Sequence, residues 1–164
     1  MRPRKEGGFS LIELLIVVAI ILIIAAIAIP NLLKSKMAAN EASASQSIRT
    51  ITTGETTYAA MCPSIGYSAA LVDLNTGAVC AGAQNILDNV TVSGTKSGYT
   101  FTYNSVVDGT GIRSSFTIIG VPGVVGTTGQ RGFGSDQSAL IRYTNDGSAP
   151  TFPVSGVGGS SALQ

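Results

Sequence analysis

A single carboxylate lies inside the most apolar stretch of the chain, and it is the residue with the clearest capacity for chemistry. Phe9 to Ile29 is a run of 21 residues in which Glu13 is the only charged side chain. A carboxylate in such a run costs about 2.5–3.5 kcal/mol at the centre of a bilayer, and less near its edge. Glu13 therefore needs a partner. Directly before the run, Gly7 and Gly8 form a permissive pair where a protease could take the backbone in extended form.

The apolar run is long enough for a membrane span. A helix of this length measures about 31 Å, which matches the hydrocarbon core of a bilayer. The leader, Met1–Gly8, has three basic residues and one acidic residue, and this charge favours a cytoplasmic N-terminus. Lys34 and Lys36 weaken that bias without reversing it. A secretory signal is disfavoured because the run is too long and no A-x-A site follows, whereas an ordinary anchor leaves Glu13 unexplained.

The segment at this junction resembles a known family. Gly8-Phe9-Ser10-Leu11-Ile12-Glu13-Leu14 is similar to the processing and methylation signature of type IV pilins and their pseudopilin relatives. The signature consists of a glycine, an aromatic residue and a glutamate four residues further on, at the mouth of an apolar run. The resemblance covers residues 1 to about 60 strongly and the rest of the chain weakly.

The resemblance implies a specific processing and assembly chemistry. A membrane prepilin peptidase would cut between Gly8 and Phe9 on the cytoplasmic side and methylate the new Phe9 amine. Glu13 would then pair with the Phe9 amine of a neighbouring subunit. A buried carboxylate and a buried ammonium are each costly alone, but together they offset much of each other's desolvation. The alternative is a Glu13 side chain that merely snorkels to the membrane interface.

Residues 9–29 should form a helix that is apolar all round and therefore needs a nonpolar environment on every side. Pro30 breaks the helical ladder, because it has no N–H and its ring crowds the carbonyl of Ala26. In the family, a proline at the matching position marks where the helix bends or melts in the filament, so the resemblance implies a role for Pro30 in assembly. A proline that simply kinks an exposed helix is the alternative.

Residues 30–61 are predicted to form a second, amphipathic helical stretch that ends at Cys62-Pro63. Its apolar face holds Leu33, Met37, Ala44, Ile48, Ile51 and Tyr58. Its polar face holds Lys34, Lys36, Asn40, Glu41, Ser45, Arg49 and Thr56. Gly54 and the neighbouring serines and threonines are poor helix formers, so a sheet must pack on the apolar face to hold this half.

The two cysteines are predicted to form a disulfide. The expected orientation puts everything after Pro30 outside the cytoplasm, where Cys62 and Cys80 would be oxidised. Closing such a loop is worth about 3 kcal/mol. A metal site is disfavoured because the chain has no histidine to complete a zinc shell. Many type IV pilins have a C-terminal disulfide that brackets a receptor-contact region, and this chain departs from that placement.

Residues 62–164 are predicted to form a globular head. Residues 62–98 contain only short mixed segments. Tyr99, Phe101 and Tyr103 then alternate with polar residues, which indicates a strand. Further strands are expected at 112–121 and 139–144, with turns at 108–111 and 145–147 and a glycine-rich loop between the two strands. We expect an antiparallel sheet of three or four strands, followed by a mobile tail at 155–164.

Other candidate chemistry has simpler explanations. Asp108, Asp136 and Asp146 are spread over 39 positions, whereas calcium needs six to eight oxygens from a compact loop, so Asx-turn roles are favoured. Asn89-Val90-Thr91 matches a glycosylation sequon, but Leu87 stands where bacterial systems usually need an acid. The aromatic residues from Tyr99 onward have strand spacing and are expected in the core. No catalytic site, metal site, cofactor or nucleic-acid site is predicted.

These observations predict an α+β fold, in which a long N-terminal helix packs through its second half on a small antiparallel sheet. The resemblance implies a structural subunit of a type IV pilus, which polymerises from the inner membrane into a surface filament for adhesion, motility or DNA uptake. Its implied partners are copies of itself, the prepilin peptidase and methyltransferase, the inner-membrane assembly machinery, the outer-membrane secretin, and lipid before assembly. After processing the protein would be extracellular.

Three alternatives stay open. A major pseudopilin of a type II secretion system shares the N-terminal half, but would need a calcium or secretin-side partner. A minor, tip-located pilin often lacks the equivalent of Glu13. A membrane-anchored binding protein that forms no polymer would make the cut between Gly8 and Phe9 unnecessary and would retain the leader.

Overall fold

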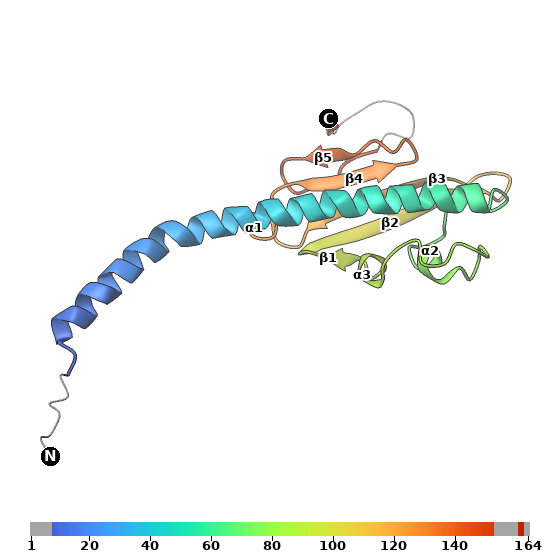
Figure 1. The fold of residues 1–164 in the computed structure, drawn as a ribbon. Coiled ribbons are helices and arrows are strands. Elements are labelled where there is room, and N and C mark those ends of the chain that lie inside the picture. Colours follow the sequence, from blue (N-terminus) through green and yellow to red (C-terminus); the bar gives the residue numbers. More distant parts are fainter. Residues whose placement is uncertain (1–7, 153–160, 163–164) are drawn as a thin grey trace, which may run out of the picture. The chain divides into compact units, whose positions relative to one another are not determined.

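The computed structural model describes residues 8–152 and 161–162. The chain divides into two compact units, Met1–Ser35 and Lys36–Gln164. Helix α1 (Leu11–Met61) contributes residues to both. The second unit contains all the other helices and strands of the described residues (Figure 1). The predicted α+β class, with a long apolar N-terminal helix followed by a small antiparallel sheet, is confirmed.

Helix α1 continues through Pro30, in agreement with the prediction of one long N-terminal helix. A proline removes one N–H from the ladder and crowds one carbonyl, in this helix that of Ala26. The other backbone hydrogen bonds of α1 remain possible, and leucine and alanine residues on both sides of Pro30 favour the helix. The predicted end of the helix at Cys62-Pro63 is confirmed, since α1 ends at Met61 and the Cys62 N–H donates to the Tyr58 carbonyl at 3.0 Å.

The second half of α1 buries one face against the sheet. Ala44, Ile48, Ile51 and Tyr58 are at most 1% exposed, as the periodicity predicts. Leu33, which was placed on the same face, is instead exposed. It lies in the first unit, Met1–Ser35.

Two glutamates of α1 are buried, and the sequence analysis had placed one of them, Glu41, on the polar face. Glu41 is 8% exposed and Glu55 is fully buried. Glu41 lies three residues before Ala44, and Glu55 lies four residues after Ile51, so helical geometry sets both on the buried stripe.

The sheet has six strands among the described residues, more than the three or four predicted. The strands pair antiparallel in sequence order, β1-β2-β3-β4-β5-β6. They are β1 (Thr95–Lys96), β2 (Tyr99–Val107), β3 (Arg113–Pro122), β4 (Gly132–Asp136), β5 (Arg142–Thr144) and β6 (Ser161–Ala162). Figure 1 shows the long strands β2 and β3 beside the second half of α1.

Strand β4 replaces part of the predicted glycine-rich loop. The glycines are needed for close packing, because a Cβ on Gly134 would lie 2.6 Å from Cζ of Phe152 and 2.9 Å from the Ile118 carbonyl oxygen. A Cβ on Gly132 would likewise collide with the Ser148 carbonyl. Between these glycines, Phe133 points into the core and is 2% exposed. Glycine in a strand thus marks close approach of another segment in this sheet.

Residues 62–98 include two short helices. Helix α2 (Asp73–Thr76) ends at Gly77, which has a φ of +63°, a conformation that favours glycine. Helix α3 (Asn89–Val92) begins after Asp88, whose side chain accepts a hydrogen bond from the Thr91 N–H at 3.1 Å. This N-cap gives the short helix a defined start.

The core lies between α1 and the sheet. Tyr99, Phe101, Phe116 and Phe133 are all at most 6% exposed, which confirms the prediction that these aromatic residues belong to the core of the head. The predicted mobile tail falls largely on residues 155–160 and 163–164, which lie outside the described residues. Within that tail, Ser161–Ala162 form β6 beside β5.

Candidate functional site

The predicted processing junction lies immediately before α1. Gly8 and Phe9 are exposed and precede the first helical residue, Leu11. No heavy atom lies within 4 Å of the position where a Gly8 Cβ would stand, and Phe9 is 87% exposed. The backbone at the Gly8–Phe9 bond is therefore outside the helix and accessible to an enzyme.

Glu13 lies in the first turn of α1 and faces its own helix start. Its Oε2 accepts a hydrogen bond from the Ser10 N–H at 3.0 Å. The Ser10-x-x-Glu13 spacing is that of a capping box, and a carboxylate is favourable near the positive end of a helix dipole. The Glu13 carboxylate thus contacts the backbone N–H of Ser10, the residue that follows Phe9.

The residues that follow Glu13 form an exposed apolar surface. α1 is the one helix of the described residues that is long and apolar enough to cross a membrane by length and composition. Leu14, Ile16, Ile20 and Ile27, for example, are each at least half exposed. Such a continuous exposed apolar surface is unusual for a protein in water and marks a membrane or protein contact. Pro30 lies at the end of this surface, inside the helix.

Glu41 joins α1 to the loop before β4. Its carboxylate accepts hydrogen bonds from the Gln130 N–H at 2.8 Å and from Arg131 Nε at 2.8 Å, and it forms an ion pair with Arg131 at 2.7 Å. Burial alone would raise the pKa of Glu41, but these hydrogen bonds and the guanidinium outweigh it and lower the pKa below 4.5. The Arg131 guanidinium also lies over the rings of Phe133 and Tyr143, 5.6 and 5.7 Å from their centroids. Glu41 therefore stabilises the packing of α1 on the sheet.

Glu55 is buried and has no ion pair with any of the described residues. Its carboxylate accepts hydrogen bonds from the Ser68 N–H at 2.9 Å and from the Ser68 hydroxyl at 2.5 Å. Tyr103 completes the group, because its hydroxyl donates to the Ser68 carbonyl at 3.0 Å. Burial raises the pKa of Glu55, and the hydrogen bonds from Ser68 only partly offset this effect. Sequence analysis missed this residue, although its position between Ile51 and Tyr58 on the apolar stripe was a usable signal.

Cys62 and Cys80 form a disulfide, with their Cα atoms 6.0 Å apart. The bond closes the segment that follows α1, and Cys80 is 1% exposed. Ser68, the partner of Glu55, belongs to this closed segment. The disulfide therefore restrains the loop that supplies the hydrogen bonds to the buried carboxylate.

The three aspartates of the sheet turns occupy separate sites. Asp108 Oδ1 accepts from the Thr110 N–H at 2.8 Å, and Asp136 and Asp146 make the equivalent bonds to the N–H groups two residues further on. These hydrogen bonds are those of Asx turns, as the sequence predicts. No group of three potential metal-binding side chains occurs within the part of the chain that the structure describes.

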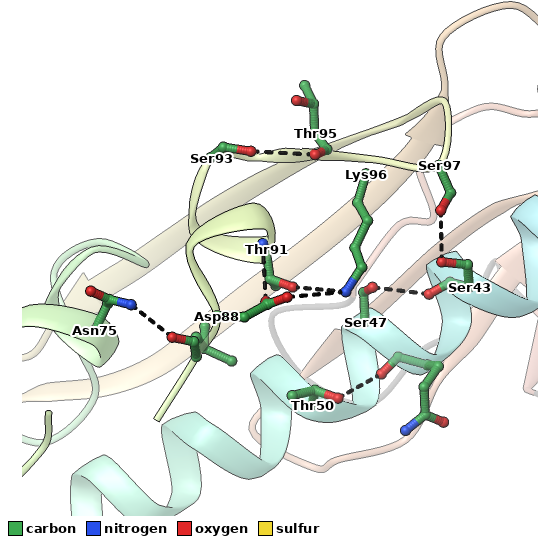
Figure 2. Close-up of polar contacts among 12 residues, drawn as sticks. Ser43, Ser47, Thr50, Asn75, Asp88, Thr91, Ser93, Thr95, Lys96 and Ser97 are labelled. Atoms are coloured by element: carbon green, nitrogen blue, oxygen red, sulfur yellow. Dashed lines mark hydrogen bonds and ion pairs between the residues drawn. The ribbon is translucent and has the colours of Figure 1, made fainter. Parts of the chain in front are cut away.

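A polar groove of about 230 Å³ lies between α1 and the segment that contains α3 and β1 (Figure 2). Lys96 donates to the Thr91 hydroxyl at 3.2 Å and pairs with Asp88 at 3.5 Å. Across the groove, the hydroxyls of Ser43 and Ser97 are 2.9 Å apart. The hydrogen bond between Ser43 and Ser97 holds the segment that contains α3 and β1 against α1. Figure 2 shows these polar side chains close together.

Comparisons with known proteins concern the N-terminal part of the chain. Residues 3–29 match the model of the prokaryotic N-terminal methylation motif. A segment of 38 residues is 60% identical to the type IV wide pilus major component PilA4 of Thermus thermophilus. That segment covers 23% of this chain and 29% of the relative, so the chain matches less than a third of the relative's length. No solved structure matches.

In its N-terminal part the chain is therefore similar to proteins that carry the prokaryotic methylation motif and to a type IV pilus component. This similarity includes the signature from Gly8 to Leu14.

Proposed function

We propose that this protein is a structural subunit of a type IV pilus and has no enzymatic role. The observation that carries the proposal is the junction at Gly8–Phe9, followed within one helical turn by Glu13 and then by an exposed apolar helix surface. The match of residues 3–29 to the methylation motif supports it.

In this proposal residues 1–8 are a leader that a prepilin peptidase removes between Gly8 and Phe9, and the new Phe9 amine is methylated. Residues 9–29 anchor the prepilin in the inner membrane, with the leader in the cytoplasm, and later form the filament core. Residues 30–61 carry the head, residues 62–164. Once the apolar residues leave the lipid, the hydrophobic effect keeps the core assembled.

Glu13 and Pro30 have assigned roles in assembly. A carboxylate that is exposed in the single chain would be buried among apolar helices in a filament, where it needs a cation. The Phe9 amine of a neighbouring copy supplies that cation and selects one stagger between helices. Pro30 marks the place where the helix yields in the filament, because its missing N–H leaves the ladder one hydrogen bond weaker.

The partners follow from this assembly route. They are further copies of the chain, the processing enzyme, the inner-membrane assembly machinery, the outer-membrane secretin and, before assembly, membrane lipid. The filament would act in adhesion, motility or DNA uptake. A major pseudopilin of a type II secretion system uses the same N-terminal chemistry and is the competing assignment.

The test is electron microscopy of the fraction sheared from intact cells, with mass spectrometry of its N-terminal peptide. Long surface filaments whose peptide begins with methylated Phe9 are the expected result. Processed protein found only in the membrane, without surface filaments, would favour the secretion pseudopilin. Retention of residues 1–8 on the mature protein would overturn both assignments.

A further inference from the structure

The sheet of the head has a second face, which we call the outer face, on the side away from the core. In β3, Phe116 and Ile118 are buried in the core between α1 and the sheet. Because side chains alternate along a strand, Ser115 and Thr117 lie on the outer face. Asp136 of β4 pairs with Thr117 and therefore lies on the same face. The outer face thus presents polar side chains that the core does not use.

A pocket of about 160 Å³ lies on the outer face, where β2, β3 and the end of β4 meet Phe152. Phe152 comes close to the sheet at Gly134, because a Cβ on this glycine would lie 2.6 Å from Cζ of the ring. The absence of a side chain at Gly134 therefore admits the ring to the sheet surface. The other residues that line the pocket include Val106, Ser115, Thr117, Asp136 and Gln137.

The polar side chains of this pocket keep hydrogen-bonding capacity for a ligand. Asp136 uses only Oδ1 in its Asx turn, where it accepts from the N–H and the hydroxyl of Ser138 at 2.9 and 2.5 Å. Its Oδ2 accepts no hydrogen bond from the described residues. The side chains of Ser115, Thr117 and Gln137 likewise make no hydrogen bond within the described ranges. The pocket therefore offers a carboxylate oxygen, two hydroxyls and an amide, which together can accept and donate hydrogen bonds.

The charge around the pocket is balanced. Arg142 of β5 pairs with Gly134, which precedes Asp136 by two residues in β4, so the guanidinium and the carboxylate belong to the same face of the sheet. A strongly cationic or anionic ligand would gain from one of these charges and be opposed by the other. The electrostatics therefore favour a neutral ligand.

We propose that this pocket binds one ring of a neutral carbohydrate. A sugar ring has C–H groups on its two faces and hydroxyls around its edge. One face would pack on the Phe152 ring, whose π-face is electronegative, and the edge hydroxyls would bond to Asp136 Oδ2, the Gln137 amide and the Thr117 hydroxyl. The pocket is smaller than those that enclose drug-sized ligands, and its size suits a single ring.

The inference goes beyond the proposed function, because the pocket belongs to the head of a single chain and does not depend on polymerisation. One sugar ring held by a shallow pocket binds weakly. In the proposed filament, however, the pocket would recur in every copy, and many weak contacts to one polysaccharide would combine through multivalency. This consequence rests on the proposed function, whereas the pocket itself does not.

The test is saturation-transfer NMR on the full chain, solubilised in a zwitterionic detergent that has no sugar headgroup. The probes are the methyl glycosides of glucose, galactose, mannose and N-acetylglucosamine at millimolar concentration. At least one of them should receive saturation at its ring protons. Phe152→Leu keeps an apolar side chain but removes the ring, and it should raise the Kd about tenfold. Gln137→Ala removes an exposed amide and should raise the Kd about threefold.

Thr102→Ala is the matched control. Thr102 lies on the outer face, since it pairs with Ile119 of β3, but it does not line the pocket, so its replacement should leave the Kd unchanged. Thermal unfolding checks that Phe152→Leu still folds, and Gln137→Ala carries the test if it does not.

Four results would overturn the proposal: no binding of any glycoside, an unchanged Kd in both pocket variants, an equal loss in Thr102→Ala, or binding of inorganic phosphate or N-acetyllysine methylamide in place of the glycosides. The last result would assign a charged ligand to the pocket. Glycoside binding by a chain that forms no filaments would overturn the proposed function alone.

Discussion

Three glutamates of α1 occupy three different environments, although their side chains are identical. Glu13 is exposed at the helix start, Glu41 is paired with Arg131, and Glu55 is buried among hydroxyls. The cost of a buried carboxylate depends on whether a cation or only neutral donors compensate it. Each glutamate therefore responds differently to neutralisation.

Glu13→Gln, or Glu13→Val, should leave membrane insertion intact and abolish filaments. Removing the charge lowers the cost of insertion, but it also removes the carboxylate that, in the proposed filament, pairs with the Phe9 amine of the neighbouring subunit. The measurement compares protein in the membrane fraction with filaments sheared from the cells. Filaments of normal length and number from either variant would contradict the assigned role of Glu13.

Glu55→Gln should change how the stability of the head depends on pH. The raised pKa means that the folded chain holds the Glu55 proton more tightly than the unfolded chain. Its contribution to folding is complete below pH 4.5 and declines as pH rises through the folded pKa. The variant should be more stable than wild type by about 1 kcal/mol at pH 8 and equal to it at pH 4, in urea unfolding of detergent-solubilised protein.

Glu41→Gln is the control with the opposite sign. The lowered pKa of Glu41 means that its contribution is present above pH 4.5 and is lost as pH falls through the folded pKa. This variant should be less stable than wild type at pH 8, and the difference should shrink in acid. Parallel pH profiles for wild type and Glu55→Gln would show that burial does not perturb Glu55.

At the scale of the element, α1 combines two different surfaces in one helix. Its first part exposes apolar side chains on every side, and its second part buries one stripe against the sheet. Gly54 lies on that stripe, where a Cβ would stand 2.9 Å from Ile86 Cγ2 and 3.6 Å from Leu87 Cδ2. The glycine lowers the helix propensity of α1, but it leaves room for the segment before α3 to pack closely against the helix.

Gly54→Leu should destabilise the head by about 2 kcal/mol, because a well-packed core tolerates added atoms poorly. The neighbouring Thr53 is exposed, so Thr53→Leu is the matched control and should change stability by less than about 0.5 kcal/mol. Thermal unfolding of both variants tests this. Equal stability of the two variants would show that the segment around Ile86 moves away freely.

At the scale of the whole molecule, a single covalent link connects the end of α1 to the loops that cover it. Replacing both Cys62 and Cys80 by serine should lower the free energy of unfolding by about 3 kcal/mol, because the unfolded chain gains the freedom of an open loop. The measurement is the urea midpoint with and without a reductant. The reductant should lower the midpoint of the wild type and leave the variant unchanged; a wild type insensitive to full reduction would contradict the prediction.

The N-terminal segment could be read from the sequence because its signals are local. The motif from Gly8 to Glu13, the apolar run and the end of α1 at Cys62-Pro63 depend on residues close together in the chain. The strands β2 and β3 were likewise evident from alternation at Tyr99–Tyr103 and around Phe116 and Ile118. Local periodicity reflects which side of an element faces the core.

Contacts between distant residues were decided only by the tertiary structure. Folding brings Glu41 to Arg131, which lies 90 positions away in the sequence. It likewise brings Glu55 to the group formed by Ser68 and Tyr103. Strand β4 lies where the sequence predicted a loop. It can form there because Gly132 and Gly134 have no side chains that would collide with Ser148 and Phe152. The sequence alone predicted the α+β fold and the candidate junction at Gly8–Phe9, since those predictions rest on composition and spacing, whereas partners brought together by folding set the environment of each buried charge.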